Sequence, residues 1–108
     1  MGVMITIYYH NQALLHDEAQ FLTTGLQSVV STVMEKKDVF AIANHDQYAA
    51  ASNPIEVFVQ VNRAKIDNPA DLTEKIAAAL IAWKQNNNFD YQINLNVMPV
   101  EWHAKLGI

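Results

Sequence analysis

Residues 55–80, IEVFVQVNRAKIDNPADLTEKIAAAL, decide the fold because the spacing of their apolar side chains changes partway along the stretch. Ile55, Val57, Val59 and Val61 alternate with polar or aromatic residues, which predicts a strand with one buried face. The later apolar residues follow the spacing of a helix. They are Leu72, Ile76, Ala79, Leu80 and Trp83. One strand followed by one amphipathic helix is therefore expected.

The start of this helix is marked by Asn68-Pro69-Ala70-Asp71. The Asn68 side chain can accept from a free amide of the first turn, where Pro69 has no N–H to leave unpaired. Asp71 lies at the positive end of the helix dipole. Arg63, the only arginine of the chain, lies between the strand and this cap.

The remaining elements follow from the same two spacings. Strands are expected at 3–9, 39–44 and 91–98, a first helix at 13–37, a loop at 44–54 and a tail at 99–108. Gly25 weakens the first helix by about 1 kcal/mol in propensity, which indicates close backbone packing at its middle. We assign Asp17 and Glu18 only to compensation of the helix dipole. The predicted order is β-α-β-β-α-β.

This order predicts an α+β fold with a four-stranded sheet and two helices on one face. Two helices can cover only one side of such a sheet, so the other side meets water or another subunit. That side mixes polar and aromatic side chains, including Glu56, Phe58, Gln60, Asn94 and Asn96. We therefore expect it to line a partly hydrated channel between subunits.

Composition limits the possible functions. The 108 residues correspond to a single domain, residues 1–108, and 51% hydrophobic with 17% charged residues indicates surface hidden in an oligomer. No cysteine is present, and the four histidines have no metal-ligand spacing, so neither a metal nor a cofactor is expected. The net charge of -4 and the scattered lysines argue against nucleic acid as a partner.

The N-terminal residues suggest no targeting signal. Gly2 and Thr6 fit the myristoylation pattern, but the same residues belong to the first predicted strand. No basic leader and no long apolar run are present, so we expect no membrane association and a cytoplasmic protein.

Two segments carry a family resemblance. Together with the order of elements, PIEVFVQVNRAK at 54–65 and NVMPVEWHAKLG at 96–107 resemble the tautomerase superfamily. This is the trimeric β-α-β fold of 4-oxalocrotonate tautomerase and macrophage migration inhibitory factor (MIF), and the likeness is to a little-characterised bacterial branch of about this length. The resemblance implies a tautomerase/MIF-like sandwich, a homotrimer and a pocket between subunits.

The chain departs from the family at its catalytic residue. Family tautomerases use an N-terminal proline exposed by methionine removal, whereas this chain has Gly2, and its prolines are Pro54, Pro69 and Pro99. Glycine also permits methionine removal, and its free amine, with an ordinary pKa of about 7.7–8.0, can shuttle a proton or form Schiff bases. We therefore assign Gly2 as the candidate catalytic residue. The other possibility is that Met1-Gly2 includes a residue foreign to the natural protein.

The remaining site candidates are assigned to substrate binding. Arg63 can bind the carboxylate of a small organic acid, or it can be a surface residue paired with Glu56 or Asp67. One of the adjacent residues Tyr8 and Tyr9 is expected in the core and the other near the amino-terminal pocket. Pocket walls are also expected from Trp102 or His103 in the tail.

Three functions fit these residues. The first is a tautomerase or isomerase acting on a small keto or unsaturated carboxylic acid through the Gly2 amine. The second is a catalytically silent trimeric relative. The third is a ferredoxin-like dimer of the small monooxygenase or haem-degrading type, which has the same order of elements. Strand arrangement distinguishes the third from the others, because the tautomerase unit pairs its two β-α-β halves as pseudo-repeats.

Overall fold

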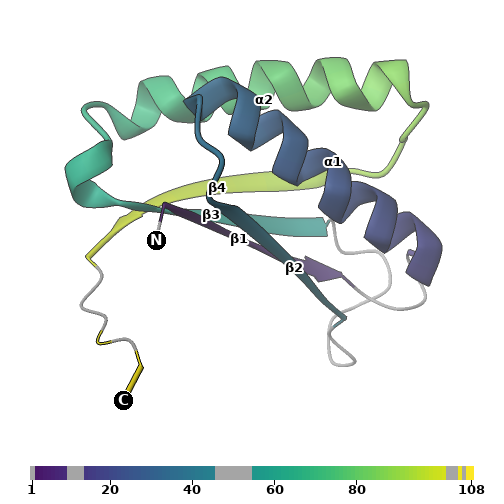
Figure 1. The fold of residues 1–108 in the computed structure, drawn as a ribbon. Helices are drawn as coiled ribbons and strands as arrows, with labels where there is room; N and C mark the ends of the chain where they lie inside the picture. The colour runs from purple at the N-terminus through teal and green to yellow at the C-terminus, as the bar shows by residue number, and fades with distance from the viewer. Residues whose placement is uncertain (1, 10–13, 46–54, 102–104, 106) are drawn as a thin grey trace.

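The computed structural model describes residues 2–9, 14–45, 55–101, 105 and 107–108. The described elements, in chain order, are β1 (Val3–Tyr9), α1 (His16–Met34), β2 (Val39–His45), β3 (Ile55–Asn62), the short 3-10 helix η1 (Arg63–Lys65), α2 (Pro69–Asn86) and β4 (Ile93–Val100). Apart from η1, this is the predicted β-α-β-β-α-β order. Both helices lie on one face of the sheet, as predicted (Figure 1).

The strand order is β2-β1-β3-β4. β1 pairs in parallel with β2, β3 pairs in parallel with β4, and the antiparallel β1–β3 pair joins the two halves. Each parallel pair is thus closed by its own helix. In the split β-α-β arrangement of a ferredoxin-like sheet, another strand separates the two parallel strands. The observed pairing therefore excludes the ferredoxin-like alternative.

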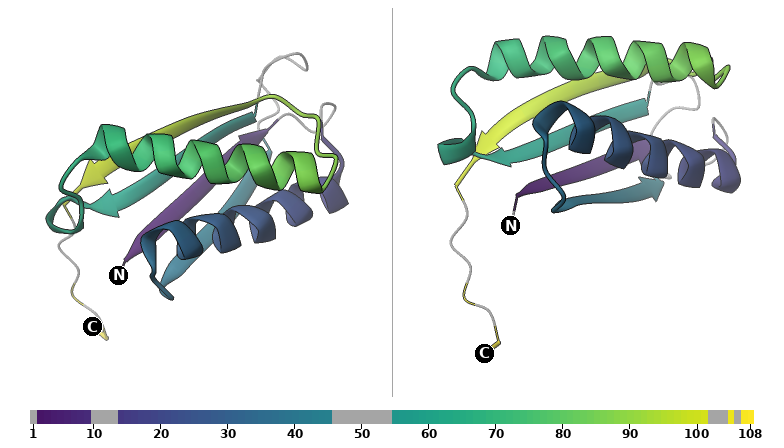
Figure 2. Two further views of the ribbon diagram at one scale, coloured as in Figure 1. Left: turned by 90° about the horizontal axis from the view of Figure 1, so that it is seen from above. Right: turned by 45° about the horizontal axis from the view of Figure 1, so that its top comes forward.

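The core lies between the sheet and the helix layer (Figure 2). Alternate residues of the two central strands point into it and are fully buried, among them Ile5, Ile7, Val57 and Val59. Leu22 and Leu26 of α1 and Ile76 of α2 cover them. Burial of each such side chain stabilises the fold by about 1.5–3 kcal/mol. The period-two spacing of β3 correctly predicted its buried face.

The two helices make a close contact at Gly25. A Cβ atom at Gly25 would lie 2.2 Å from Cζ2 of Trp83, so only a residue without a side chain fits against the indole. Trp83 also contacts the rings of Phe21 and Phe89, at centroid distances of 5.2 and 5.4 Å. The predicted close packing at Gly25 is confirmed.

Glu18 does more than compensate the helix dipole. Its Oε1 accepts from the backbone N–H of Leu15 at 3.0 Å, and its Oε2 accepts from the Tyr91 hydroxyl at 2.6 Å. The hydrogen bond to Glu18, followed by burial and the carboxylate charge, raises the pKa of Tyr91. The dipole assignment was incomplete because the contact joins residues far apart in the sequence.

The last strand is displaced from the predicted range 91–98. β4 begins at Ile93, and its pairing with β3 continues through Pro99, opposite Val61, to Val100. Proline is tolerated there because β4 is an edge strand and needs backbone hydrogen bonds on one side only. Tyr91 instead packs on Phe89, with ring centroids 5.1 Å apart.

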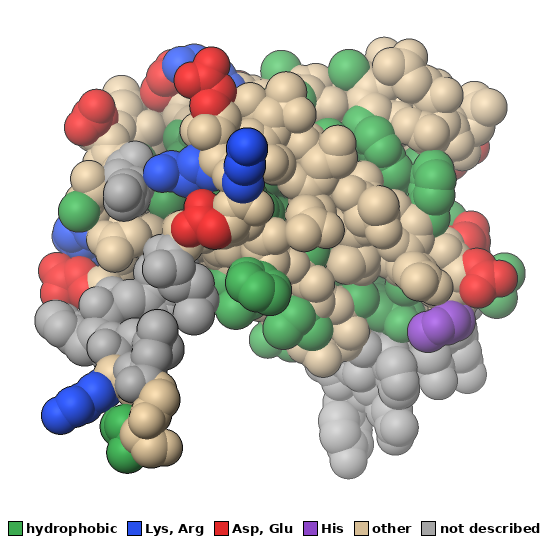
Figure 3. Space-filling view, viewed as in Figure 1, with side chains coloured by type: hydrophobic (Ala, Val, Ile, Leu, Met, Phe, Trp, Pro, Cys, Tyr) green, Lys and Arg blue, Asp and Glu red, His purple; other side chains and the backbone are tan. Residues whose placement is uncertain are grey.

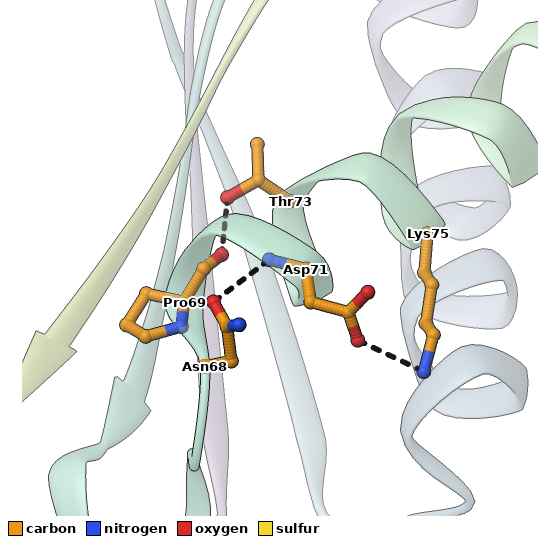
Figure 4. Close-up of polar contacts among 5 residues, drawn as sticks. All are labelled: Asn68, Pro69, Asp71, Thr73 and Lys75. Atoms are coloured by element: carbon orange, nitrogen blue, oxygen red, sulfur yellow. Dashed lines mark hydrogen bonds and ion pairs between the residues drawn. The ribbon is translucent and has the colours of Figure 1, made fainter.

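The predicted start of α2 is confirmed (Figure 4). Oδ1 of Asn68 accepts from the Asp71 N–H at 3.1 Å, and the Thr73 hydroxyl donates to the Pro69 carbonyl at 2.7 Å. Asp71 also pairs with Lys75 at 3.1 Å, one turn along the helix. At the other end, Asn88 adopts the left-handed conformation expected of an asparagine beyond a helix terminus, with φ 51°.

The Gly25–Trp83 contact predicts an unusual response to an alanine substitution. Gly25→Ala raises helix propensity by about 1 kcal/mol, yet we expect it to lower the free energy of unfolding by about 1–3 kcal/mol, because the new methyl group collides with the indole. Urea unfolding measures the change.

Ser28→Ala is the matched control, because Ser28 is exposed on the same helix and should only gain propensity. In a Trp83→Leu background the cost of Gly25→Ala should shrink. An equal cost in both backgrounds would show that the indole is not the cause.

Candidate functional site

The end of the sheet at which β1 begins brings together residues from all four strands. Val3 pairs with Val39 of β2 and with Val61 of β3, and Val61 pairs with Pro99 of β4. Continuing each pairing by one residue places Asp38, Gly2, Asn62 and Val100 side by side. Arg63 and Glu101 follow at the same end. The structure thus brings the predicted residues Gly2 and Arg63 to one sheet end within a single chain.

Gly2 is buried at this end, directly against Asp38. A Cβ atom on Gly2 would lie 2.4 Å from both carboxylate oxygens of Asp38. The backbones are also joined there, because the Val3 N–H donates to the Asp38 carbonyl at 3.2 Å. The side chain nearest to the candidate catalytic residue is therefore an acid.

Arg63 begins η1 directly after β3, where the Asn62 side chain accepts from the Ala64 N–H at 3.0 Å. Its guanidinium Nε lies 3.9 Å from Oε1 of Glu101, and both side chains are about two-thirds exposed. Such an exposed pair contributes at most about 1 kcal/mol. The guanidinium can therefore exchange Glu101 for another carboxylate at little cost.

Neither of the two surface partners considered for Arg63, Glu56 and Asp67, pairs with it. Among the described residues, the ion pair of Arg63 is with Glu101. Glu56 lies at the opposite end of β3, where its carboxylate accepts from the amides of Asn94 at 2.8 Å and Asn96 at 3.2 Å.

A groove of about 250 Å³ lies on the helix side of the same end, between the end of α1 and the start of α2. Its apolar walls are Val33, Met34, Ile66 and Leu72, and its polar lining is Lys36, Asp67, Asn68, Asp71 and Lys75. Figure 3 shows charged side chains of both signs gathered over this end of the molecule. This volume lies just below the range of about 300–1,000 Å³ that is typical of pockets for drug-sized ligands.

Tyr8 and Tyr9 lie at the other end of β1. Tyr9 is buried in the core, whereas Tyr8 is exposed on the open sheet face and packs edge-on against Phe58 at 5.7 Å. The predicted division between faces is confirmed. Tyr8 is nevertheless about 20 Å along the strand from Gly2. A single chain does not bring the two together, and Trp102 and His103 lie outside the described residues.

The open face of the sheet carries both polar and exposed apolar side chains. Its β3–β4 part carries the hydrogen-bonded group of Glu56, Asn94 and Asn96. Its β2 part is apolar, with Phe40 and Ile42 exposed by 59% and 48%. Exposed apolar side chains adjoining on one face are typical of a surface that another chain covers.

The described residues contain no cluster of three or more His, Asp or Glu side chains that could hold a metal ion. No described helix is both long enough and apolar enough to cross a membrane.

Sequence reasoning missed Asp38, Glu101 and the groove residues Lys36 and Ile66. The place of Asp38 in the candidate site was predictable, since Asp38 directly precedes the strand predicted at 39–44. A parallel pairing of that strand with the first one would have placed it beside Gly2. The place of Glu101 was not predictable, because Glu101 follows a strand whose end was predicted two residues too early.

No family model matches the chain, and no curated protein matches it either. Solved structures do match. A macrophage migration inhibitory factor from Toxoplasma gondii is 14% identical with a TM-score of 0.64, covering 96% of this chain and 97% of that one. A 5-carboxymethyl-2-hydroxymuconate isomerase from Deinococcus radiodurans is 15% identical with a TM-score of 0.59, covering 94% and 83%. A domain of unknown function from Sebaldella termitidis is 12% identical with a TM-score of 0.62, covering 98% and 97%.

These likenesses extend over nearly the whole chain and establish its architecture. The protein has the tautomerase/MIF fold, as the resemblance implied. At 12–15% identity they carry the fold alone.

Proposed function

We propose that this protein is a tautomerase-type enzyme that acts on a small keto or unsaturated carboxylic acid. In this proposal the amine of Gly2, freed by removal of Met1, moves the proton, and Arg63 binds the carboxylate. The observation that carries the proposal is the strand register, which puts the start of β1 and the end of β3 at one sheet end. An isomerase among the structural neighbours supports the reaction class.

The chemistry requires one base and one anion-binding group. The neutral amine takes a proton from the carbon next to the carbonyl group, and the C–H electrons form an enolate. The resulting ammonium returns its proton to another atom of the conjugated system, which completes the isomerisation. A guanidinium 4 Å from a carboxylate contributes roughly 4 kcal/mol of attraction at an effective dielectric of 20, which is enough to orient a small acid.

A homotrimer completes the proposal. The open face carries apolar Phe40 and Ile42 beside polar Glu56 and Asn96, which suits a partly hydrated interface between copies. Assembly also offers a route by which Tyr8 of one copy could approach Gly2 of another. No single chain allows this contact.

A catalytically silent trimer is the second candidate. Two observations favour it: glycine stands in place of the family's proline, and Arg63 is already paired with Glu101. Activity measurements decide between the two.

The amine mechanism predicts that blocking the terminus abolishes activity. Acetylation of the Gly2 amine in Met1-trimmed protein should remove enol–keto conversion of a small 2-keto acid, followed by ultraviolet absorbance. Protein acetylated only at lysines is the control and should stay active. Full activity with a blocked terminus would remove the amine from the mechanism, whereas inactivity of the trimmed protein itself would favour the silent relative.

The carboxylate assignment predicts opposite effects for the two members of the ion pair. Arg63→Ala should weaken binding of pyruvate roughly tenfold or more, because a charge-assisted contact is lost, and Glu101→Gln should strengthen it by freeing the guanidinium. Calorimetric titration gives the dissociation constants.

Lys84→Ala, at the far end of α2, is the matched control for loss of a positive charge. Unchanged affinity in Arg63→Ala would exclude Arg63 from the site. Because the Arg63 side chain is exposed, the free energy of unfolding of the Arg63→Ala variant should stay within about 0.5 kcal/mol of the parent value.

The open face predicts the oligomeric state. Light scattering should give about three times the 12.1 kDa mass of the chain. Ile42→Glu should dissociate the assembly, whereas Leu15→Glu, at an even more exposed apolar residue on the helix side, should leave it intact. A stable monomer for the parent protein would contradict the trimer.

A further inference from the structure

We infer that Gly2 and Asp38 form one functional unit, in which the Asp38 carboxylate holds the freed amine as an ammonium ion and occupies the space of any side chain at position 2. Asp38 is thereby a positioning residue of the proposed site. The inference rests on the proposed function only in that Met1 is removed and the amine moves a proton.

The Asp38 carboxyl group fills the space beside the Gly2 Cα. A Cβ atom on Gly2 would lie 2.4 Å from Oδ1 and Oδ2 of Asp38 and 2.5 Å from its Cγ, so the whole carboxyl group faces the Gly2 Cα. The backbone cannot easily open the gap, because Val3 pairs with Val39 and its N–H donates to the Asp38 carbonyl. Gly107 is different, since a Cβ there would meet open space. Position 2 therefore fits glycine as long as Asp38 keeps this conformation.

The Asp38 carboxylate also places a negative charge close to the Gly2 nitrogen. The bond lengths around Cα place the carboxylate oxygens within roughly 5 Å of the Gly2 nitrogen. An opposite charge at that distance favours the ammonium form of an amine. Among the described residues, the other charged groups at this end are Glu35, Lys36 and Lys37 before β2, the Arg63–Glu101 pair beyond β3 and β4, and the groove residues Asp67, Asp71 and Lys75. The exposed ion pair brings charges of both signs, so Asp38 is the carboxylate that faces the amine directly.

The unit changes the expected resting state of the site. An amine held as ammonium is ready to donate a proton, so the reaction it favours from rest is protonation of an enol or enolate at carbon. In that step the ammonium N–H bond breaks and the electron pair of the C=C bond forms the new C–H bond. The enol O–H bond breaks at the same time, its electrons form the carbonyl double bond, and its proton passes to water. The neutral amine then regains a proton from water. We therefore expect an enolic acid to be the substrate and the keto acid the product.

The amine can be titrated without any assay of activity. The chain has three glycines, so protein labelled with ¹³C-glycine gives three glycine signals, and Gly25 and Gly107 serve as internal references. The Gly2 Cα shift should titrate with a pKa above the ordinary value of about 7.7–8.0. Asp38→Asn should lower that pKa by roughly half a unit, as expected of an exposed carboxylate.

Asp67→Asn is the matched control, because Asp67 is an exposed acid of the same end that makes no described contact with Gly2. It should leave the Gly2 titration unchanged. Equal pKa values in the parent and Asp38→Asn proteins would overturn the inference. That outcome is separate from failure of the proposed function, which would appear as a shifted amine in a protein without isomerase activity.

A double-mutant cycle tests the space argument. Because the exposed Asp38 carboxylate can turn away, Gly2→Ala should lower the free energy of unfolding only slightly in the parent protein, and this small cost should vanish in an Asp38→Gly background, which empties the space. The stability of each variant is measured by urea unfolding, and the Gly2 signal is not needed. Additive effects of the two substitutions would show that Asp38 does not restrict position 2.

Discussion

The antiparallel pairing of β1 with β3 is the contact on which the rest of the structure depends. In each β-α-β half the two strands pair in parallel with each other. Within its own half, the inner strand, β1 or β3, therefore has a hydrogen-bonded neighbour on one side only. Val3, Ile5 and Ile7 of one half are buried beside Val61, Val59 and Val57 of the other, and this ladder makes the two halves one core. The same register sets which residues meet at each end of the sheet. The site is therefore a consequence of how the halves are joined.

The elements that were predicted correctly from the sequence are those that depend on the spacing of residues close together in the chain. The alternation from Ile55 to Val61 and the cap at Asn68 each involve neighbours in the chain, so the sequence alone was enough to locate them. The limits of β4 were not predictable in this way. Its end at Val100 depends on the length of β3 beside it, and a proline inside the strand is acceptable only at a sheet edge.

The site was predictable only where its members stood out by type or position. Arg63 drew attention as a sole arginine after a strand, and Gly2 drew attention as a departure from a family pattern. Asp38 has neither property, and the role proposed for it depends on a distance of a few ångströms to a residue 36 positions earlier. Glu18 and Tyr91 show the same limit, because their hydrogen bond spans 73 positions. Contacts of this kind follow from strand order, which composition and periodicity do not give.

Pro99 makes the two edges of the sheet unequal. An edge strand exposes unpaired N–H and C=O groups that can pair with a strand from another molecule. β4 lacks one such donor, because proline has no N–H, whereas β2 keeps all of its donors and carries exposed Phe40 and Ile42 as well. Pairing with a strand of another molecule is thus hindered at β4 and possible at β2. We therefore expect a chain that folds but remains unassembled to aggregate through β2 rather than through β4.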